Sequence, residues 1–315
     1  MRIVLSRKGY DSANGGMPSP VFVSSDENWN YRMYSLPIPE FRRNSDGSII
    51  SFNTGAKRSD LRYPRDFDVK VSYPKGLDSD FFVHHDPDIR RYTHRRIPEN
   101  WVPVYGQTEG AATHLRGEHD EHLGTDTLFI YFGLFQFVAR NAEGSWVRMP
   151  GTEPFHAIWG YLQAKKVVCM DISKRKCSEA VARYSWHPHC SEHKLQSRKN
   201  TLYIGSESPL TFDGRVMDVP SYGTFKYSRE LALTADRMSS SRWSLDSLPW
   251  LDLDNRLPHM THHDGKSFGN GFFQSAMIGQ EFIVDEDAAT CEKVFSWLEN
   301  LLRNRETRDG EGILE

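Results

Sequence analysis

Short apolar runs alternate with polar, turn-rich segments over the first 71 residues, a pattern that favours strands and loops over helices. The run Ile3–Leu5 is followed at once by "RKGYDSANGGMPSP" (7–20), and the later runs are broken by Gly, Pro, Asn and Asp. Two prolines in "YSLPIPEF" place that segment at a sheet edge or in a loop.

The middle of the chain carries two long runs of aromatic and β-branched residues. They are "DTLFIYFGLFQFV" (126–138) and "FHAIWGYLQAKKVVCM" (155–170), joined by a polar connector. This pattern predicts neighbouring strands of an antiparallel sheet or a small barrel. "NTLYIGSE" (200–207) and "SRELALT" (228–234) predict further strands.

The clearest helix is expected over 285–306, where acidic residues suit the positive end of the helix dipole. Val294, Trp297, Leu298 and Leu301 then share one face at helical spacing. We therefore predict an α+β fold: one β-rich domain over 1–305, closed by the C-terminal helix and followed by a flexible tail over 306–315.

Composition narrows the classes of function. The 39 basic residues are balanced by 42 acidic ones, which excludes a purely electrostatic nucleic-acid binder. The four cysteines show no CxxC spacing, which suits a reducing compartment. The chain has no apolar leader and no run of membrane-spanning length, so we expect a cytoplasmic protein without a membrane partner.

"FFVHHDPDIRR" (81–91) places Asp86 and Asp88 where a strand would end. On an extended strand, residues two apart point to one side, so we expect His84 to face the same way as Asp86, and Asp86 the same way as Asp88. Such a group could bind a divalent metal or a ribose, or serve as acid and base. A polar turn with solvated histidines is the alternative.

Two further segments concentrate polar side chains. "WHPHCSEH" (186–193) carries metal-competent donors, but no second ligand pair follows at a distance. We therefore favour an exposed loop, or a single histidine that meets a substrate, over a zinc site. "THHDGKSFGNGFFQSAMIGQEF" (261–282) lacks the Lys-Ser/Thr ending of a phosphate-binding loop. Its Gln and Glu side chains suit either a nucleobase edge or a satisfied loop.

Two other features suggest ligand contacts. Arg242 and Trp243 could stack on a base or hold a phosphate, or form a surface cation–π contact. In the loop over 7–20, Gly15 and Gly16 allow positive φ, and Asp11 either supports its own turn or helps to hold a sugar-like or anionic group.

Read in order, many short motifs are similar to one family. They are "LSRKGYDSANGGMPSPVF", "SLPIPE", "HHDPDI", "GAATHL", "TLFIYFGLF", "HAIWGYLQ", "YSWHPH", "NTLYIGSE", "LTADRMSSSRWSL" and "FFQSAMIGQEFIVD". From Arg2 to about Trp297 the chain resembles the nucleotide modification associated domains of the third class, found in bacteria and their phages. The resemblance implies a role in the modification of bases in nucleic acid.

Carried over position by position, the resemblance implies two sets of site residues. The candidate catalytic residues are Asp11, Asp86, Asp88, His114, His189 and Glu281. The candidate substrate-binding residues are Gly15, Gly16, Ser19, Arg242, Gln274 and Gln280. His187 also matches. The chain departs from the family pattern at His85 and around His262 and His263, so no role is carried over to these three.

We expect an intracellular enzyme that acts on a nucleotide or nucleobase in nucleic-acid modification or processing. Its partner would be a nucleotide or nucleic acid, and its cofactor is left unidentified, with a divalent metal as the candidate. One alternative is a metal-dependent hydrolase. Another is a non-catalytic reader of a modified or flipped base, which would depend on Trp159 or Tyr131. By analogy alone, the paired strands also resemble PUA-like barrels.

Overall fold

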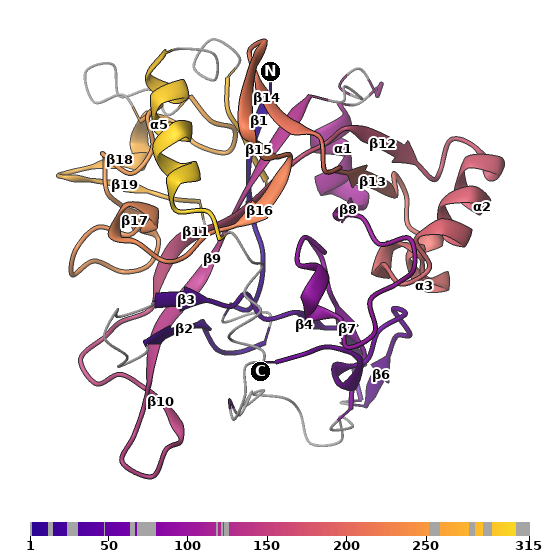
Figure 1. The fold of residues 1–315 in the computed structure, drawn as a ribbon, viewed down its shortest axis with the longest axis horizontal. Coiled ribbons are helices and arrows are strands. Elements are labelled where there is room, and N and C mark those ends of the chain that lie inside the picture. Colours follow the sequence, from indigo (N-terminus) through magenta and orange to yellow (C-terminus); the bar gives the residue numbers. More distant parts are fainter. Residues whose placement is uncertain are drawn as a thin grey trace.

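The computed structural model describes residues 2–11, 15–23, 31–46, 48–63, 67, 80–117, 119–120, 122, 126–251, 259–276, 281–285 and 292–306. Strands dominate it, as Figure 1 shows. The first ten strands are β1 Arg2–Arg7, β2 Ser19–Val23, β3 Tyr31–Met33, β4 Ile38–Pro39, β5 Phe41–Arg43, β6 Ile49–Ser51, β7 Val83–His84, β8 Val104–Gln107, β9 Thr127–Arg140 and β10 Trp146–Arg148. The others are β11 Phe155–Gln163, β12 Lys166–Cys169, β13 Thr201–Ile204, β14 Pro209–Phe212, β15 Arg215–Pro220, β16 Tyr222–Thr224, β17 Arg242–Trp243, β18 Phe268–Gly269, β19 Phe272–Gln274 and β20 Glu281–Ile283.

The helices are shorter elements at the margins of the strands. They are α1 Glu109–Arg116, α2 Lys174–Arg183, α3 Glu192–Leu195 and α5 Glu292–Arg303. Five 3-10 turns complete the list: η1 Arg58–Asp60, η2 Arg91–Thr93, η3 Pro188–Cys190, η4 Arg229–Leu231 and η5 Gly265–Ser267. None of the described helices is both long and apolar enough to cross a membrane.

The central sheet is organised around β9. Its main strand order is β16-β11-β9-β1-β20, and β2, β3 and β10 pair beside this path. β9 runs antiparallel to β11 and parallel to both β1 and β2. The described strands of this sheet follow an open order, so the barrel-like half suggested by the PUA analogy does not form. The prediction of a β-rich α+β fold is confirmed.

The loop within 7–20 connects β1 and β2, two strands that both pair with β9. β1 pairs with β9 as far as Arg7↔Phe132, and β2 resumes at Ser19↔Phe135. Between them the chain leaves the sheet, with Gly15 at φ +101° and Gly16 at φ +74°. The expected positive φ is therefore confirmed at both glycines, and the loop connects two strands.

Two predicted elements need correction. The run 155–170 forms two strands rather than one, because β11 ends at Gln163 and β12 begins at Lys166. "SRELALT" is not a strand: it holds the 3-10 turn η4 followed by isolated bridges. Helix α5 is described from Glu292, so Glu286 and Asp287, two of the acidic residues expected to begin it, lie outside the described residues.

The main apolar core lies between the central sheet and α5. Val294, Leu298 and Leu301 of α5 are buried in it, and Trp297 is half-buried against Trp250. This confirms the predicted face of the helix. A separate cluster packs α2 against β8, β12 and β13. Cys169, Cys177 and Cys190 are free thiols, as the spacing of the cysteines predicted.

Candidate metal centre

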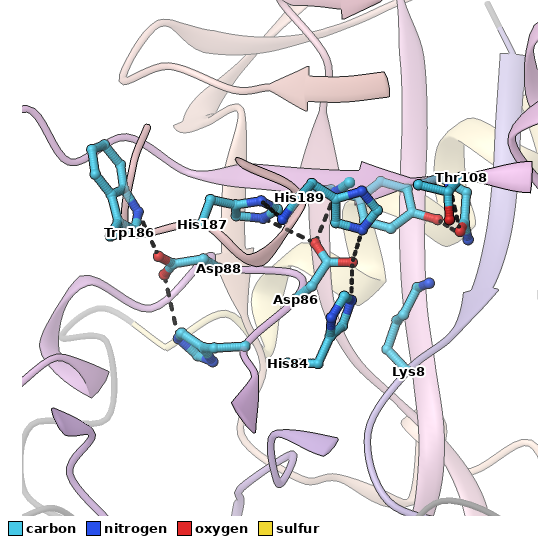
Figure 2. A network of polar contacts seen from close by, with 12 residues as sticks. Lys8, His84, Asp86, Asp88, Thr108, Trp186, His187 and His189 are labelled. Carbon is cyan, nitrogen blue, oxygen red and sulfur yellow. Dashed lines mark hydrogen bonds and ion pairs between the residues drawn. The ribbon is translucent and has the colours of Figure 1, made fainter. Parts of the chain in front are cut away.

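Buried carboxylates and imidazoles meet where β7 ends and η3 begins (Figure 2). β7 stops at His84 and the chain bends at Pro87, so Asp88 is no longer on the strand that carries His84. The expected pairing of His84 with Asp86 is confirmed, with 3.7 Å between His84 Nε2 and Asp86 Oδ2. Asp86 and Asp88, in contrast, have separate sets of partners.

The Asp86 side chain is only 2 % exposed. Its Oδ1 accepts hydrogen bonds from the Gly106 backbone N–H (2.8 Å) and from His187 Nε2 (3.2 Å). Burial raises the pKa of this carboxyl, but the hydrogen bond from His187 and the nearby His84 and His189 imidazoles outweigh burial and hold the pKa well below its usual range. Asp86 is therefore a carboxylate with one oxygen fully occupied.

The hydrogen bonds of Asn200 determine which nitrogen of His189 carries the proton. Asn200 Nδ2 donates to the backbone carbonyls of His189 (2.8 Å) and Lys194 (3.0 Å). Its Oδ1 must then accept from His189 Nδ1, which lies 2.9 Å away. Burial lowers the pKa of His189 well below its usual value, so the ring is neutral and its Nε2 bears a lone pair.

Neighbouring polar groups also orient the other two imidazoles, His187 and His84. His187 Nδ1 accepts from the backbone N–H of His189, which leaves its Nε2–H to donate to Asp86. His84 Nδ1 lies 2.9 Å from Glu40 Oε2, and Lys194 pairs with the other Glu40 oxygen at 3.2 Å. A carboxylate behind a metal-binding histidine is a frequent outer-shell arrangement.

The remaining oxygen of Asp86 faces two imidazole nitrogens across gaps that no hydrogen bond spans. Asp86 Oδ2 lies 3.7 Å from His84 Nε2 and 3.9 Å from His189 Nε2. Hydrogen bonds at such distances are ineffective. Tetrahedral ligands about 2.1 Å from a zinc ion lie about 3.4 Å apart, so the spacing suits a shared cation. His84, Asp86 and His189 form a metal-competent group whose ligand atoms lie within 4.8 Å of one another.

Asp88 has a different environment, because both of its oxygens are occupied. Oδ2 accepts from His94 Nε2 (2.7 Å) and Trp186 Nε1 (3.1 Å). Oδ1 accepts from Trp101 Nε1 (3.1 Å) and lies 3.4 Å from His85 Nε2. His85, Asp88 and His94 also form a metal-competent group, but the three N–H groups that donate to Asp88 occupy both of its oxygens and leave less room for an ion than at Asp86. This geometry favours a positioning role for Asp88.

Gly106 on β8 leaves the room that His189 occupies. A Cβ atom at this position would lie 2.3 Å from His189 Cδ2. We expect Gly106→Ala to push the imidazole away from Asp86 and to lower the free energy of unfolding by about 1–3 kcal/mol. Chemical denaturation measures this change.

Gly110→Ala on α1 is the matched control for Gly106→Ala, because no atom lies within 4 Å of its added Cβ. We expect it to stabilise the protein by up to about 1 kcal/mol. Equal effects of the two alanines would contradict the packing argument.

A second buried carboxylate, Glu281, also contacts residues of β8. Its Oε1 accepts from Gln107 Nε2 (2.7 Å), Tyr105 OH (2.8 Å) and Ser6 Oγ (3.2 Å), and Lys8 Nζ lies 3.3 Å away. β8 thus joins the two carboxylates, because Gly106 donates to Asp86 and its neighbour Gln107 donates to Glu281. Figure 2 shows the Lys8 side chain extending beside His84 and Asp86.

The phenol of Tyr131 is affected by both of these carboxylates. Burial, followed by the charges of Asp86 and Glu281, raises the pKa of this phenol well above its usual value. Within the described part of the chain, its buried hydroxyl has no hydrogen-bond partner.

Other residues predicted to belong to the site contact partners outside the cluster around Asp86. His114 Nε2 lies 3.0 Å from Thr261 Oγ1, and its ring lies beside His262. Ser19 Oγ accepts from the Leu36 backbone N–H (3.1 Å). The Asp11 carbonyl accepts from the Gly16 N–H (2.9 Å), which supports the turn.

Arg242 and Gln274 are brought together as a cross-strand pair of β17 and β19. Arg242 is exposed and lies over the Phe272 ring at 4.8 Å, the surface cation–π contact named above as one outcome. Gln274 Nε2 donates to nearby backbone carbonyls. Figure 1 shows these strands on the opposite side of the molecule from β7. Gln280 lies outside the described residues.

The segment 186–193 is not an exposed loop, because Trp186 is half-buried and His187, His189 and Cys190 are buried. Sequence patterns gave no reason to select Glu40, Asn200 or Lys8, which act on the centre from distant segments. The one usable signal for Glu40 is its place in the motif "SLPIPE".

The comparisons with known proteins agree with the resemblance seen in the sequence. No curated protein and no solved structure matches this chain. The model of one family, described as nucleotide modification associated domain 3, matches residues 2–285. This match includes the whole cluster around Asp86 and Glu281, and the chain belongs to the nucleotide modification associated domain 3 family.

Proposed function

We propose that the protein is a metal-dependent enzyme that modifies a nucleotide or a nucleobase. His84, Asp86 and His189 would hold a divalent transition metal, and the family supplies the nucleotide theme. The observation that carries the proposal is the orientation of His189. Its Nδ1–H is committed to Asn200, so a nitrogen lone pair faces Asp86 Oδ2 across 3.9 Å.

Without a cation, this arrangement brings two electron-rich atoms together inside the protein, which is unfavourable. A metal ion between them would turn the repulsion into two coordinate bonds. His84 lies on the same oxygen of Asp86, with Glu40 behind it as the outer-shell carboxylate. His187 keeps the other Asp86 oxygen in place by donating to it.

Two imidazoles and one carboxylate leave coordination positions open, and this donor set occurs in hydrolytic zinc sites and in non-haem iron oxygenases. A bound metal would supply Lewis acidity or redox chemistry at those positions. The chain's own contribution is a polar wall beside them. Glu281 holds Lys8 and Tyr105 in place there.

The reader hypothesis has less support, since its aromatic side chains are not available to a base. Tyr131 is fully buried and Trp159 is 3 % exposed, and both belong to the main core. A base could not stack on either ring without opening the core. The buried polar cluster favours chemistry over simple binding.

Elemental analysis of the purified protein tests the proposal. We expect about one zinc or iron atom per chain, and zinc would indicate hydrolytic chemistry whereas iron would indicate oxidation. Asp86→Asn and His189→Gln should each lose most of the metal. Near-complete loss is expected because each removes one of only three protein ligands.

His193→Gln is the matched control, because His193 lies four residues after His189 but is exposed and stacks on Phe52. Its metal content should equal that of the wild type. Metal-free wild-type protein that also fails to take up added Zn²⁺, Fe²⁺ or Mn²⁺ would refute the metal centre.

A further inference from the structure

A small cavity lies beside the candidate metal centre. Its wall includes Gly9 from the loop after β1, Asp86 and Pro87 from the centre itself, and Arg90, Thr93 and Trp159. The cavity has a volume of about 20 Å³, enough for one water molecule or for one oxygen atom of a larger group.

Arg90 is a buried cation without a counter-charge. It is 6 % exposed, and among the described residues no carboxylate lies within ion-pair distance of it. Its Nη2 donates to the Met33 carbonyl (2.9 Å), while the buried Nε has no hydrogen-bond partner. The guanidinium lies 5.5 Å from the Tyr34 ring centroid and 5.6 Å from that of Trp159, contacts that leave its charge unneutralised.

Two neighbours of Arg90 on the cavity wall also have unsatisfied polar atoms. Trp159 Nε1 and Thr93 Oγ1 are buried and have no hydrogen-bond partner within the described residues. Trp159 sits at a bulge, where the register of β11 against β9 shifts between Ile158 and Gly160. Bulges commonly re-aim a side chain next to an active site.

Three unsatisfied donors around one cavity are costly to the protein on its own. Each buried donor without a partner costs about 1–3 kcal/mol, and a buried unpaired charge costs more. An oxyanion would satisfy the guanidinium, the indole N–H and the hydroxyl together. Asp86 also borders the cavity, but its Oδ1 accepts from Gly106 and His187, and its Oδ2 would face the metal ion.

We propose that Arg90, Trp159 and Thr93 form an oxyanion site that holds a phosphate or carboxylate group of the molecule modified at the metal centre. The inference rests on the proposed function for the identity of that molecule. Binding of the anion itself depends only on these three residues. One oxygen would enter the cavity while the rest of the group stays at its mouth.

Thermal unfolding in the presence of anions tests the site. The probes are inorganic phosphate, a nucleoside monophosphate and succinate, each compared with chloride at matched ionic strength. We expect wild-type Tm to rise with an oxyanion, and whether phosphates or succinate raise it identifies the source. Thr93→Val, which replaces only the hydroxyl with a methyl group, should weaken the anion's affinity by about tenfold.

Arg90→Met separates ligand binding from a structural role. We expect it to abolish the anion response while leaving the Tm without anion unchanged or higher, because it removes an unpaired buried charge. Arg175→Met, at a residue whose side chain is 84 % exposed, should keep the full response.

All samples are measured as purified and after chelator treatment, so that failure of the metal centre and failure of the anion site appear separately. The proposal is overturned if no oxyanion raises the wild-type Tm above that in chloride. It is also overturned if Arg90→Met keeps the response.

Discussion

Replacing Asp88 with alanine is expected to lower the free energy of unfolding by about 3–5 kcal/mol, the cost typical of removing one partner from a buried charged network. Asp88 is 1 % exposed, and its oxygens lie against His94, Trp101, Trp186 and His85. These partners come from three separate stretches of the chain. Alanine would leave their N–H groups buried and unpaired.

Chemical denaturation measures the loss, and Asp236→Ala serves as the control. Asp236 pairs with Arg229, but the Asp236 side chain is 84 % exposed, so a change within about 0.5 kcal/mol is expected. Asp88→Asn should fall between the two, since the amide keeps one acceptor oxygen. A small effect of Asp88→Ala would show that the network contributes little to stability.

Substitutions of the two aspartates of "HDPD" are thus expected to affect different properties of the protein. Asp86→Asn should remove the metal, because one of its oxygens faces two imidazoles without a hydrogen bond. Asp88→Asn should chiefly reduce stability, because both oxygens of its carboxylate already accept hydrogen bonds from buried or half-buried side chains. Metal content and unfolding measured on the same two variants therefore separate a ligand from a positioning residue.

Local patterns predicted the features that depend on local geometry. The aromatic runs gave the long strands β9 and β11, the helical spacing gave the buried face of α5, and strand alternation placed His84 beside Asp86. These predictions succeed because the period of a strand or a helix fixes which side chains share a face. The same argument failed for Asp88, since the chain bends at Pro87.

The rest of the centre is assembled by contacts between distant segments. Asn200 orients His189 across 11 positions, His187 reaches Asp86 across 101, and Tyr105 reaches Glu281 across 176. No periodicity encodes such pairs. The polar appearance of "WHPHCSEH" also suggested an exposed loop, whereas Trp186 and His187 can be buried because each donates to a buried carboxylate.

The stability of the protein should fall between pH 7 and pH 5, in part because of His156. This histidine on β11 is buried, and its Nδ1 accepts a hydrogen bond from Trp243 Nε1 (3.1 Å). Burial, with a smaller effect of the Arg7 charge, lowers its pKa from 6.5 to about 3. The folded protein therefore keeps His156 neutral in this range while the unfolded chain binds a proton, so stability declines on acidification. The expected contribution is about 2 kcal/mol from pH 7 to pH 5.

His156→Asn isolates this contribution, because the amide oxygen can accept from Trp243 at about the position of Nδ1 but does not titrate. Denaturation of both proteins at pH 7, 6 and 5 should show a shallower decline for the variant. Most carboxylates stay ionised over this interval, so they affect both proteins alike. His263, whose pKa burial lowers to about 4, adds a decline of the same sign to both. Parallel pH profiles would mean that the folded protein protonates His156 as readily as the unfolded chain does, and would contradict the argument.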